Sequence, residues 1–317
     1  MIRIDQLSKR YGQVMAVDTV SMQVEKGTIA VIVGTSGSGK STLLRMINRL
    51  IEPSSGRVFI DGRDTASEPA HLLRRRIGYV IQGYGLFAHR TVAQNIATVP
   101  QPPGWEPARI ATRVHHRVVQ VALDPAQYAD KLPHQLSGGQ QQRVGVARAL
   151  AAEPAVLLMD EPFGALDPII RGKAQDDLLA IQRRFGTTIV LVTHDLDEAF
   201  RLGSRVAVMS QGRLLQYDAP TELLRQPRDE LVARMTGLAD RALRLLSLVR
   251  AGDVISRAGT QAATAPDEPT LPASASLRDV LSELVWHGAS SARVADEHGA
   301  VLGTLTLTGL LSYGRGA

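Results

Sequence analysis

An eight-residue segment, GTSGSGKS at 34–41, constrains the fold of this chain more than any other feature. It follows the apolar run TIAVIV and precedes STLLRMINRL, whose apolar residues have helical spacing. A strand, a glycine-rich loop and a helix in this order form a phosphate-binding loop, because successive backbone N–H groups of the loop converge on phosphate oxygens. The segment therefore predicts a nucleotide site at the end of a buried strand in an α/β fold.

Each residue type in this loop has an expected role. Gly34, Gly37 and Gly39 allow the backbone to curl tightly. Lys40 is expected to reach the β- and γ-phosphates, and Ser41 to ligate Mg²⁺. The residues expected to hold the nucleotide here are Gly34, Thr35, Ser36, Gly37, Ser38, Gly39, Lys40, Ser41 and Thr42.

Two adjacent carboxylates follow a second apolar run. AVLLM at 155–159 predicts a buried strand, and Asp160 and Glu161 come directly after it. Adjacent acids at a strand end can also be an ordinary solvated turn. Because the chain has a phosphate loop, we expect Asp160 to hold Mg²⁺ and Glu161 to be the general base that polarises the attacking water.

Two more polar residues follow apolar runs that predict buried strands. His194 comes just after TIVLV at 188–192, and Gln82 directly after IGYVI at 77–81. A lone histidine in such a position is more often structural than catalytic. Parallel strands would bring both residues to the sheet edge of the phosphate loop, where His194 reaches the γ-phosphate and Gln82 contacts Mg²⁺ and the attacking water.

A second segment suited to phosphate lies about a hundred residues after the first. Ser137, Gly138 and Gly139 of HQLSGGQQQR run into a string of helix formers. The N-terminus of a helix offers unpaired N–H groups and a partial positive charge, which together suit an anion. These residues alone leave open whether both segments serve the same nucleotide.

The rest of the chain predicts a layered α/β core with a helical insertion at about 89–152. RVAVMSQGRLLQYD at 205–218 predicts a hairpin with its turn at Gln211-Gly212. The first domain is expected to span residues 1–236 and to end at LVARMTG, followed by a connecting segment and an Ala/Thr/Pro-rich linker at 237–276. Residues 277–317 then predict an amphipathic helix and a strand–turn–strand, a small α+β region.

Composition argues against several classes of protein. The chain has no cysteine, which excludes disulfides and thiolate metal sites. Its apolar runs are far shorter than the roughly 20 residues of a membrane-spanning helix, and MIRIDQLSKRYG lacks the apolar core of a secretory signal. A net charge of +5 over 317 residues and 4% aromatic residues give little support for nucleic-acid binding.

The order of these motifs resembles that of ABC-transporter ATPase domains. The phosphate loop, LSGGQ at 136–140, the acidic pair, GALD at 164–167 and VTHD at 192–195 follow one another as in that family, across residues 1 to about 235. The resemblance implies a P-loop ATPase fold with a helical subdomain. It also implies a head-to-tail dimer in which Ser137, Gly138, Gly139 and Gln140 of one copy cap the γ-phosphate bound by the other.

Two further roles are implied by the resemblance. Tyr11, in SKRYG, matches the aromatic residue that stacks on adenine, and Asp167, in GALD, matches the residue that communicates across the dimer. IGYVIQGYGLFAHRTVAQNI and DEPFGALDPIIR are similar to importer ATPases for quaternary amines such as glycine betaine, choline and carnitine. Related importers for other solutes and exporters remain alternatives. A soluble ABC protein that acts on nucleic acid is a less favoured alternative.

This resemblance also implies partners and a location. Importer ATPases form a dimer, here most simply a homodimer, on the cytoplasmic face of the plasma or inner membrane. They bind integral permease subunits, for which LFAHRTVAQNI at 86–96 is the expected docking face. An extracytoplasmic solute-binding protein acts with them indirectly. Residues 277–317 resemble a single CBS repeat, although Gly309 stands where nucleotide-binding repeats carry an aspartate, so a regulatory role and a degenerate remnant both remain open.

Overall fold

A computed structural model describes residues 1–83, 85–99, 106–237, 240–258 and 268–314 of the chain. The chain divides into two compact units, Met1–Asp218 and Ala219–Ala317. The division falls ahead of the boundary expected near residue 236. Its physical reason is that helix α9 (Pro220–Arg225) packs against α11 (Arg241–Leu248) within the second unit.

A six-stranded sheet carries the first unit. Its strand order is β10 (Arg213–Asp218), β9 (Arg205–Ser210), β3 (Ile29–Gly34), β8 (Thr188–Val192), β7 (Val156–Asp160) and β6 (Ile77–Val80). All neighbours are parallel except β9 and β10. Every residue of β3, β7 and β8 is buried, as expected for strands covered on both faces. The predicted α/β fold and these buried strands are confirmed.

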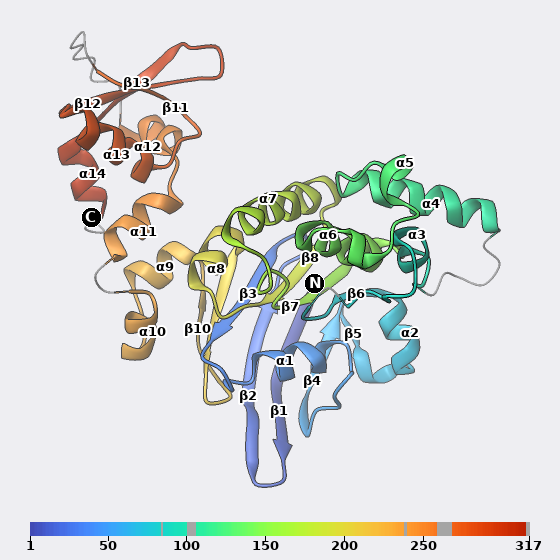
Figure 1. Cartoon of the computed structure of the whole chain (residues 1–317). Coiled ribbons are helices and arrows are strands. Elements are labelled where there is room, and N and C mark those ends of the chain that lie inside the picture. The colour runs from blue at the N-terminus through green and yellow to red at the C-terminus, as the bar shows by residue number, and fades with distance from the viewer. Residues whose placement is uncertain (84, 100–105, 238–239, 259–267, 315–317) are drawn as a thin grey trace. The chain divides into compact units, whose positions relative to one another are not determined.

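A second, antiparallel sheet contains β2 (Val14–Val24), β1 (Ile2–Tyr11), β4 (Ser55–Ile60) and β5 (Arg63–Asp64) in that order. Helix α1 (Lys40–Ile47) directs four apolar side chains into a core that it shares with strands of both sheets: Leu43, Leu44, Met46 and Ile47. In Figure 1, α1 lies between the antiparallel sheet and the parallel one. The phosphate loop therefore leads into a helix that is fixed by the core.

Further helices cover the face of the parallel sheet that is opposite to α1. The region expected to be helical contains α3 (Val92–Ile96), α4 (Pro107–Gln120), α5 (Pro125–Tyr128) and α6 (Gly138–Leu150), while residues 100–105 of its loop lie outside the described residues. Two more helices follow strands of the sheet: α7 (Pro168–Phe185) and α8 (Leu196–Leu202). Figure 1 shows α6, α7 and α8 across the sheet from α1. A short helix, α2 (Ala70–Arg75), precedes β6.

The predicted hairpin turn braces the phosphate loop. Gln211 and Gly212 have φ angles of 47° and 79°, the left-handed conformation that a two-residue type I′ turn requires. The amide of Gly212 donates to the carbonyl of Ser38 at 3.2 Å, and its carbonyl accepts from the amide of Asp18 at 2.8 Å. The turn thus ties the phosphate loop to the antiparallel sheet.

The second unit contains α9, α10 (Glu230–Met235), α11, α12 (Ala251–Ala258) and a three-stranded sheet. The sheet is formed by β11 (Thr270–Pro272), β12 (Ser291–Ala295) and β13 (Val301–Thr306), with α13 (Leu277–His287) before β12 and α14 (Leu307–Gly314) after β13. The expected helix and strand–turn–strand are confirmed. Residues 259–267 of the expected linker lie outside the described residues, and the likeness to a CBS repeat stays a prediction.

Candidate active site

Four neighbouring strands of the parallel sheet end at the residues that the sequence singles out. The strands β3, β8, β7 and β6 lead to the phosphate loop, His194, Asp160 and Gln82 respectively. A cleft of about 520 Å³ at this edge is lined by Ala16, Ser36, Gly37, Ser38, Gly39, Lys40, Ser41, Thr42, Gln82, Glu161 and His194. The structure therefore brings most of the phosphate loop, Gln82, Glu161 and His194 into one cleft.

Glycine is required at both ends of the loop turn. A Cβ added to Gly34 would lie 2.2 Å from the carbonyl oxygen of Met209, and one added to Gly39 would lie 2.2 Å from that of Ala16. Gly39 also has φ 98° and offers no side chain to cap α1. The first N–H groups of α1 are therefore left for an anion in the cleft.

The loop holds a buried cation and a buried hydroxyl. Lys40 is 6% exposed, and its Nζ donates to the carbonyls of Gly34 at 2.8 Å and Thr35 at 2.9 Å. Burial lowers the pKa of the Lys40 ammonium, and the carboxylates of Glu161 and Asp160 oppose that shift. The Oγ of Ser38 is buried without a hydrogen-bond partner. Such a donor set fits the phosphates of a nucleotide.

Asp160 and Ser41 form the expected oxygen pair. Asp160 is 2% exposed, and its Oδ1 accepts from the Oγ of Ser41 at 2.8 Å. Carboxylate and hydroxyl oxygens are ligands that suit Mg²⁺. The other carboxylate oxygen lies 3.3 Å from a guanidinium nitrogen of Arg45. Arg45 was not expected at the site from the sequence, although it stands four residues after Ser41 and therefore on the same face of α1.

Glu161 is held over the cleft by two side chains. Its Oε2 accepts from the Nε2 of Gln82 at 3.2 Å and lies 3.4 Å from the Nδ1 of His194. Its backbone has φ 45°, and its amide donates to the carbonyl of Val192 at 2.9 Å. A left-handed non-glycine residue stores strain, and such residues cluster at functional sites. The arrangement suits a carboxylate that takes a proton from a water in the cleft.

The glycine-rich segment at 137–140 does not line this cleft. Ser137 is the N-cap of α6: its Oγ accepts from the amide of Gln140 at 3.4 Å, and the Oε1 of Gln140 accepts from the amide of Ser137 at 2.9 Å. Gly139 allows close packing, since an added Cβ would lie 2.4 Å from the Cγ2 of Ile170 on α7. The cleft and the start of α6 are thus separate within one chain.

Tyr11 and Asp167 also lie apart from the cleft lining. Tyr11 ends β1 with 48% of its surface exposed, and the ammonium of Lys9 is 5.1 Å from its ring centroid. Asp167 is the N-cap of α7, where its Oδ1 accepts from the amides of Ile169 and Ile170, both at 3.1 Å. Their roles toward adenine and a second copy stay predictions.

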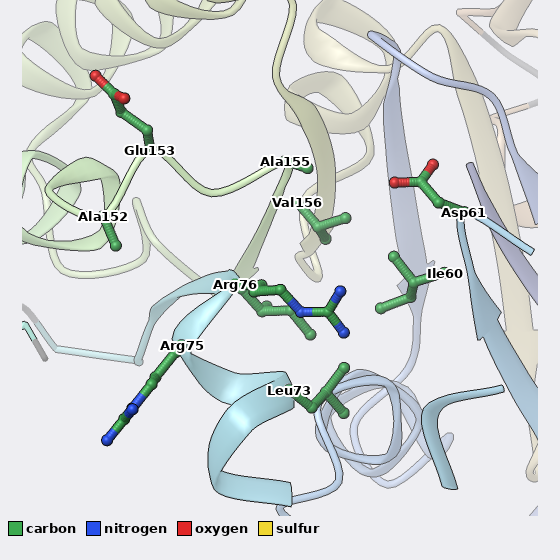
Figure 2. A pocket seen from close by; sticks show the side chains of 10 residues that line it. Ile60, Asp61, Leu73, Arg75, Arg76, Ala152, Glu153, Ala155 and Val156 are labelled. Atoms are coloured by element: carbon green, nitrogen blue, oxygen red, sulfur yellow. The ribbon is translucent and has the colours of Figure 1, made fainter. Parts of the chain in front are cut away.

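A pocket of about 460 Å³ lies at the opposite edge of the sheet, where Ile77 and Val156 begin β6 and β7. Figure 2 shows the guanidinium of Arg76 directed between Leu73 and Ile60. Arg76 pairs with Glu68. None of the predicted site residues lines this pocket, whose walls are mainly apolar. The chemistry therefore belongs to the cleft at the phosphate loop.

Among the described residues, no helix has the length and apolar character that crossing a membrane demands.

Comparison with known proteins relates the whole chain to transport ATPases. Residues 17–164 match the model of a family described as "ABC transporter". The chain is 46% identical to the glycine betaine uptake system ATP-binding protein YehX of Escherichia coli, over 98% of this chain and 99% of that protein. It is also 46% identical to the osmoprotectant import ATP-binding protein OsmV of Salmonella typhimurium, over 96% of this chain and 78% of that protein.

Solved structures of ABC proteins are also similar to this chain. The dimeric post-hydrolysis state of the ATP-binding cassette MJ0796, bound to ADP and phosphate, matches with a TM-score of 0.62 and 31% identity over 69% of this chain and 99% of that one. The cbiO1 subunit from Clostridium perfringens, part of the ABC transporter complex cbiONQ, matches with a TM-score of 0.65 and 29% identity over 78% of this chain and 98% of that one.

Proposed function

The chain belongs to the family of ABC transporter ATP-binding proteins, and from that premise we propose that it is the ATP-hydrolysing subunit of an importer for quaternary-amine osmoprotectants such as glycine betaine or choline. The observation that carries the substrate class is the 46% identity to a glycine betaine uptake ATP-binding protein over nearly the full length of both chains. The cleft at the phosphate loop supports the hydrolytic role.

Binding and hydrolysis follow from the cleft residues. Lys40 and the N–H groups at the start of α1 bind the β- and γ-phosphates. Ser41, Asp160 and Gln82 would hold Mg²⁺, which shields the phosphate charge when bound. Glu161 takes a proton from the water whose oxygen attacks the γ-phosphorus, and the bond from phosphorus to the β-phosphate oxygen breaks. His194, beside Glu161, contacts the γ-phosphate.

A second copy completes each cleft in this proposal. The start of α6 offers N–H groups to an anion but lies apart from its own chain's cleft. Two copies arranged head to tail would place Ser137 to Gln140 of one against the γ-phosphate bound to the other. Tyr11 would stack on adenine, and Asp167 would contact the second copy. The dimer of MJ0796 gives a precedent in the same family.

Residues 86–96 are proposed as the docking face for permease subunits at the cytoplasmic side of the membrane. Asn95 is fully buried and organises this segment: its Oδ1 accepts from the amide of Phe87 at 2.8 Å, and its Nδ2 donates to the carbonyls of Phe87, Arg90 and Thr91. Phe87 itself is 45% exposed. A rigid loop with an exposed aromatic residue suits a protein contact.

A solute-binding protein would act through the permease. Residues 277–317 are proposed as a CBS-like appendage.

Uptake of labelled glycine betaine, with ATPase turnover of the purified protein, tests the proposal. Glu161→Gln should lower turnover by about 100-fold or more, since general-base catalysis contributes on the order of 10² to 10⁴, and should abolish uptake while ATP still binds. Glu52→Gln, an exposed glutamate outside the cleft, should change neither. Uptake that persists in Glu161→Gln would refute the substrate class, and normal turnover in that variant would refute the assigned base.

A further inference from the structure

One arginine bonds to both turns that flank the cleft at Glu161. Arg171, on α7, donates through its Nη2 to the carbonyl of Leu166 at 3.0 Å and through its backbone amide to the carbonyl of Asp167 at 2.8 Å. Its Nη1 lies 3.5 Å from the Oδ2 of Asp195. Leu166 and Asp167 end the turn that begins at Glu161, and Asp195 adjoins His194. Arg171 therefore joins the two turns.

Asp195 is committed on both of its carboxylate oxygens. Its Oδ1 caps α8 by accepting from the amides of Asp197 at 2.9 Å and Glu198 at 3.1 Å, which leaves Oδ2 for Arg171. The amide of Asp195 donates to the Oγ1 of Thr193 at 3.0 Å. His194 thus stands between two residues whose positions are fixed, and one of them is fixed by Arg171.

These contacts close a ring around the candidate base. The Oε2 of Glu161 lies 3.4 Å from the Nδ1 of His194, and the next residue, Asp195, pairs with Arg171. Arg171 in turn donates to the carbonyl of Leu166, which belongs to the same turn as Glu161. Arg171 is the only member of this ring that is neither in one of the two turns nor in the cleft lining. Its removal would leave the two turns joined only through the Glu161–His194 contact and the sheet.

We propose that Arg171 is a positioning residue for ATP hydrolysis, which fixes the turn carrying Asp167 relative to His194 and so holds Glu161 in its working position. The inference rests on the proposed function. Arg171 does not line the cleft, so its action is on the geometry of the reacting groups and not on nucleotide binding. The expected signature is therefore a fall in kcat with little change in KM for ATP.

The chain offers a matched control in Arg201. This residue also joins α7 to α8: its guanidinium donates to the Oε1 of Gln175 at 3.2 Å and to the Oδ1 of Asp176 at 2.8 Å. Neither bond reaches the turn of Asp167 or that of His194. Replacing either arginine by methionine removes polar bonds between the two helices and keeps an unbranched side chain. Only Arg171 also holds the turns.

The experiment compares ATPase kinetics of the full chain with those of Arg171→Met, Arg201→Met and Glu161→Gln, together with nucleotide binding and thermal unfolding. A shift of about 1 Å in a catalytic group can lower a rate on the order of 100-fold. We expect kcat to fall about tenfold or more in Arg171→Met and less than twofold in Arg201→Met. KM for ATP should stay within about twofold in both. Arg171→Lys, which keeps the charge but not the forked donor, should recover part of kcat.

Asp195→Asn tests the same link from its other side, since an asparagine can still cap α8. If Arg171 acts through Asp195, the double variant should be no slower than the slower single variant. Equal losses of kcat in Arg171→Met and Arg201→Met, or a loss confined to KM, would overturn the inference. Full loss in Glu161→Gln with normal kcat in Arg171→Met would overturn the inference alone. An inactive wild-type chain would instead count against the proposed function and the inference together.

Discussion

Two helices of the first unit begin at glycine-rich turns, and their N-termini are built in opposite ways. Helix α1 follows Gly39, which supplies no cap, and its first residue is the buried cation Lys40. Helix α6 follows Ser137, which caps it reciprocally with Gln140. The Nε2 of Gln140 is in turn bonded to the hydroxyl of Tyr128 at 3.1 Å. The N-terminus of α1 has no side-chain cap and lies in a cleft, whereas at α6 the side chain of Ser137 caps the amide of Gln140.

The difference shows what turns a helix start into a complete nucleotide site. At α1 the open N–H groups are accompanied by a cation, a pair of Mg²⁺-compatible oxygens in Ser41 and Asp160, and a carboxylate in Glu161. At α6 none of the residues bonded to Ser137 or Gln140 carries a charge. The proposed nucleotide role of α6 therefore requires a second copy to supply the cation and the carboxylates.

The largest effect is expected at α1. Lys40→Met removes the buried ammonium expected to bind the phosphates, and truncating one partner of a buried charge pair costs about 2–5 kcal/mol, on the order of 10² to 10³ in affinity. ATP binding to isolated monomers, measured by calorimetry, should weaken by that factor. An unchanged dissociation constant in Lys40→Met would erase the distinction between the two helix starts.

A smaller and more selective effect is expected at α6. Ser137→Arg places a long side chain at a start of α6 that does not line its own cleft, so monomers should bind ATP within about twofold of wild type, whereas turnover of the assembled dimer should fall about 100-fold. Monomer binding and steady-state turnover measured on the same preparation separate the two outcomes. If monomers of this variant lost ATP, the start of α6 would belong to its own chain's cleft.

The smallest effect concerns a third helix start, that of α8, where a buried carboxyl follows the cap. Glu198 is 5% exposed, and burial raises its pKa to about 7 from an ordinary value of 4.5. The Thr193 hydroxyl, Gln175 and the Arg171 guanidinium favour the charged form, and the Asp195 carboxylate opposes it. A raised pKa of an acid destabilises the fold as pH rises, because the folded chain must then bury the charge.

The free energy of unfolding should accordingly fall by about 3 kcal/mol on account of Glu198 as pH rises from below 4.5 to above 7, and stay level at higher pH. Glu198→Gln cannot ionise and should lose this slope, so its stability relative to wild type rises with pH. Urea unfolding at pH 5 and pH 8 measures the change, with Glu52→Gln as an exposed control. Parallel pH profiles for wild type and Glu198→Gln would show that burial does not perturb this carboxyl.

The sequence predicts the cleft well because its residues follow strands that are apolar throughout. β3, β7 and β8 are buried on both faces, so their ends could be located from composition alone, and parallel pairing then brings Lys40, Glu161 and His194 together. The sequence does not show which side chains on elements far apart in the chain face one another. Arg45 and Arg171 act across such contacts, with Asp160 and Asp195 respectively, and both were therefore missed.

The sheet order also dictates when the phosphate loop can form during synthesis. β3 lies near the start of the chain, yet its sheet partners are β8 and β9, and the contacts around it span 161 to 175 residues. At roughly 5–20 residues per second, a ribosome needs on the order of 10 to 30 s to deliver those partners. During that interval the apolar residues of β3 have no partner strand to pair with. The nascent chain therefore depends on being shielded from aggregation until about two thirds of it, through β9 at Ser210, has emerged.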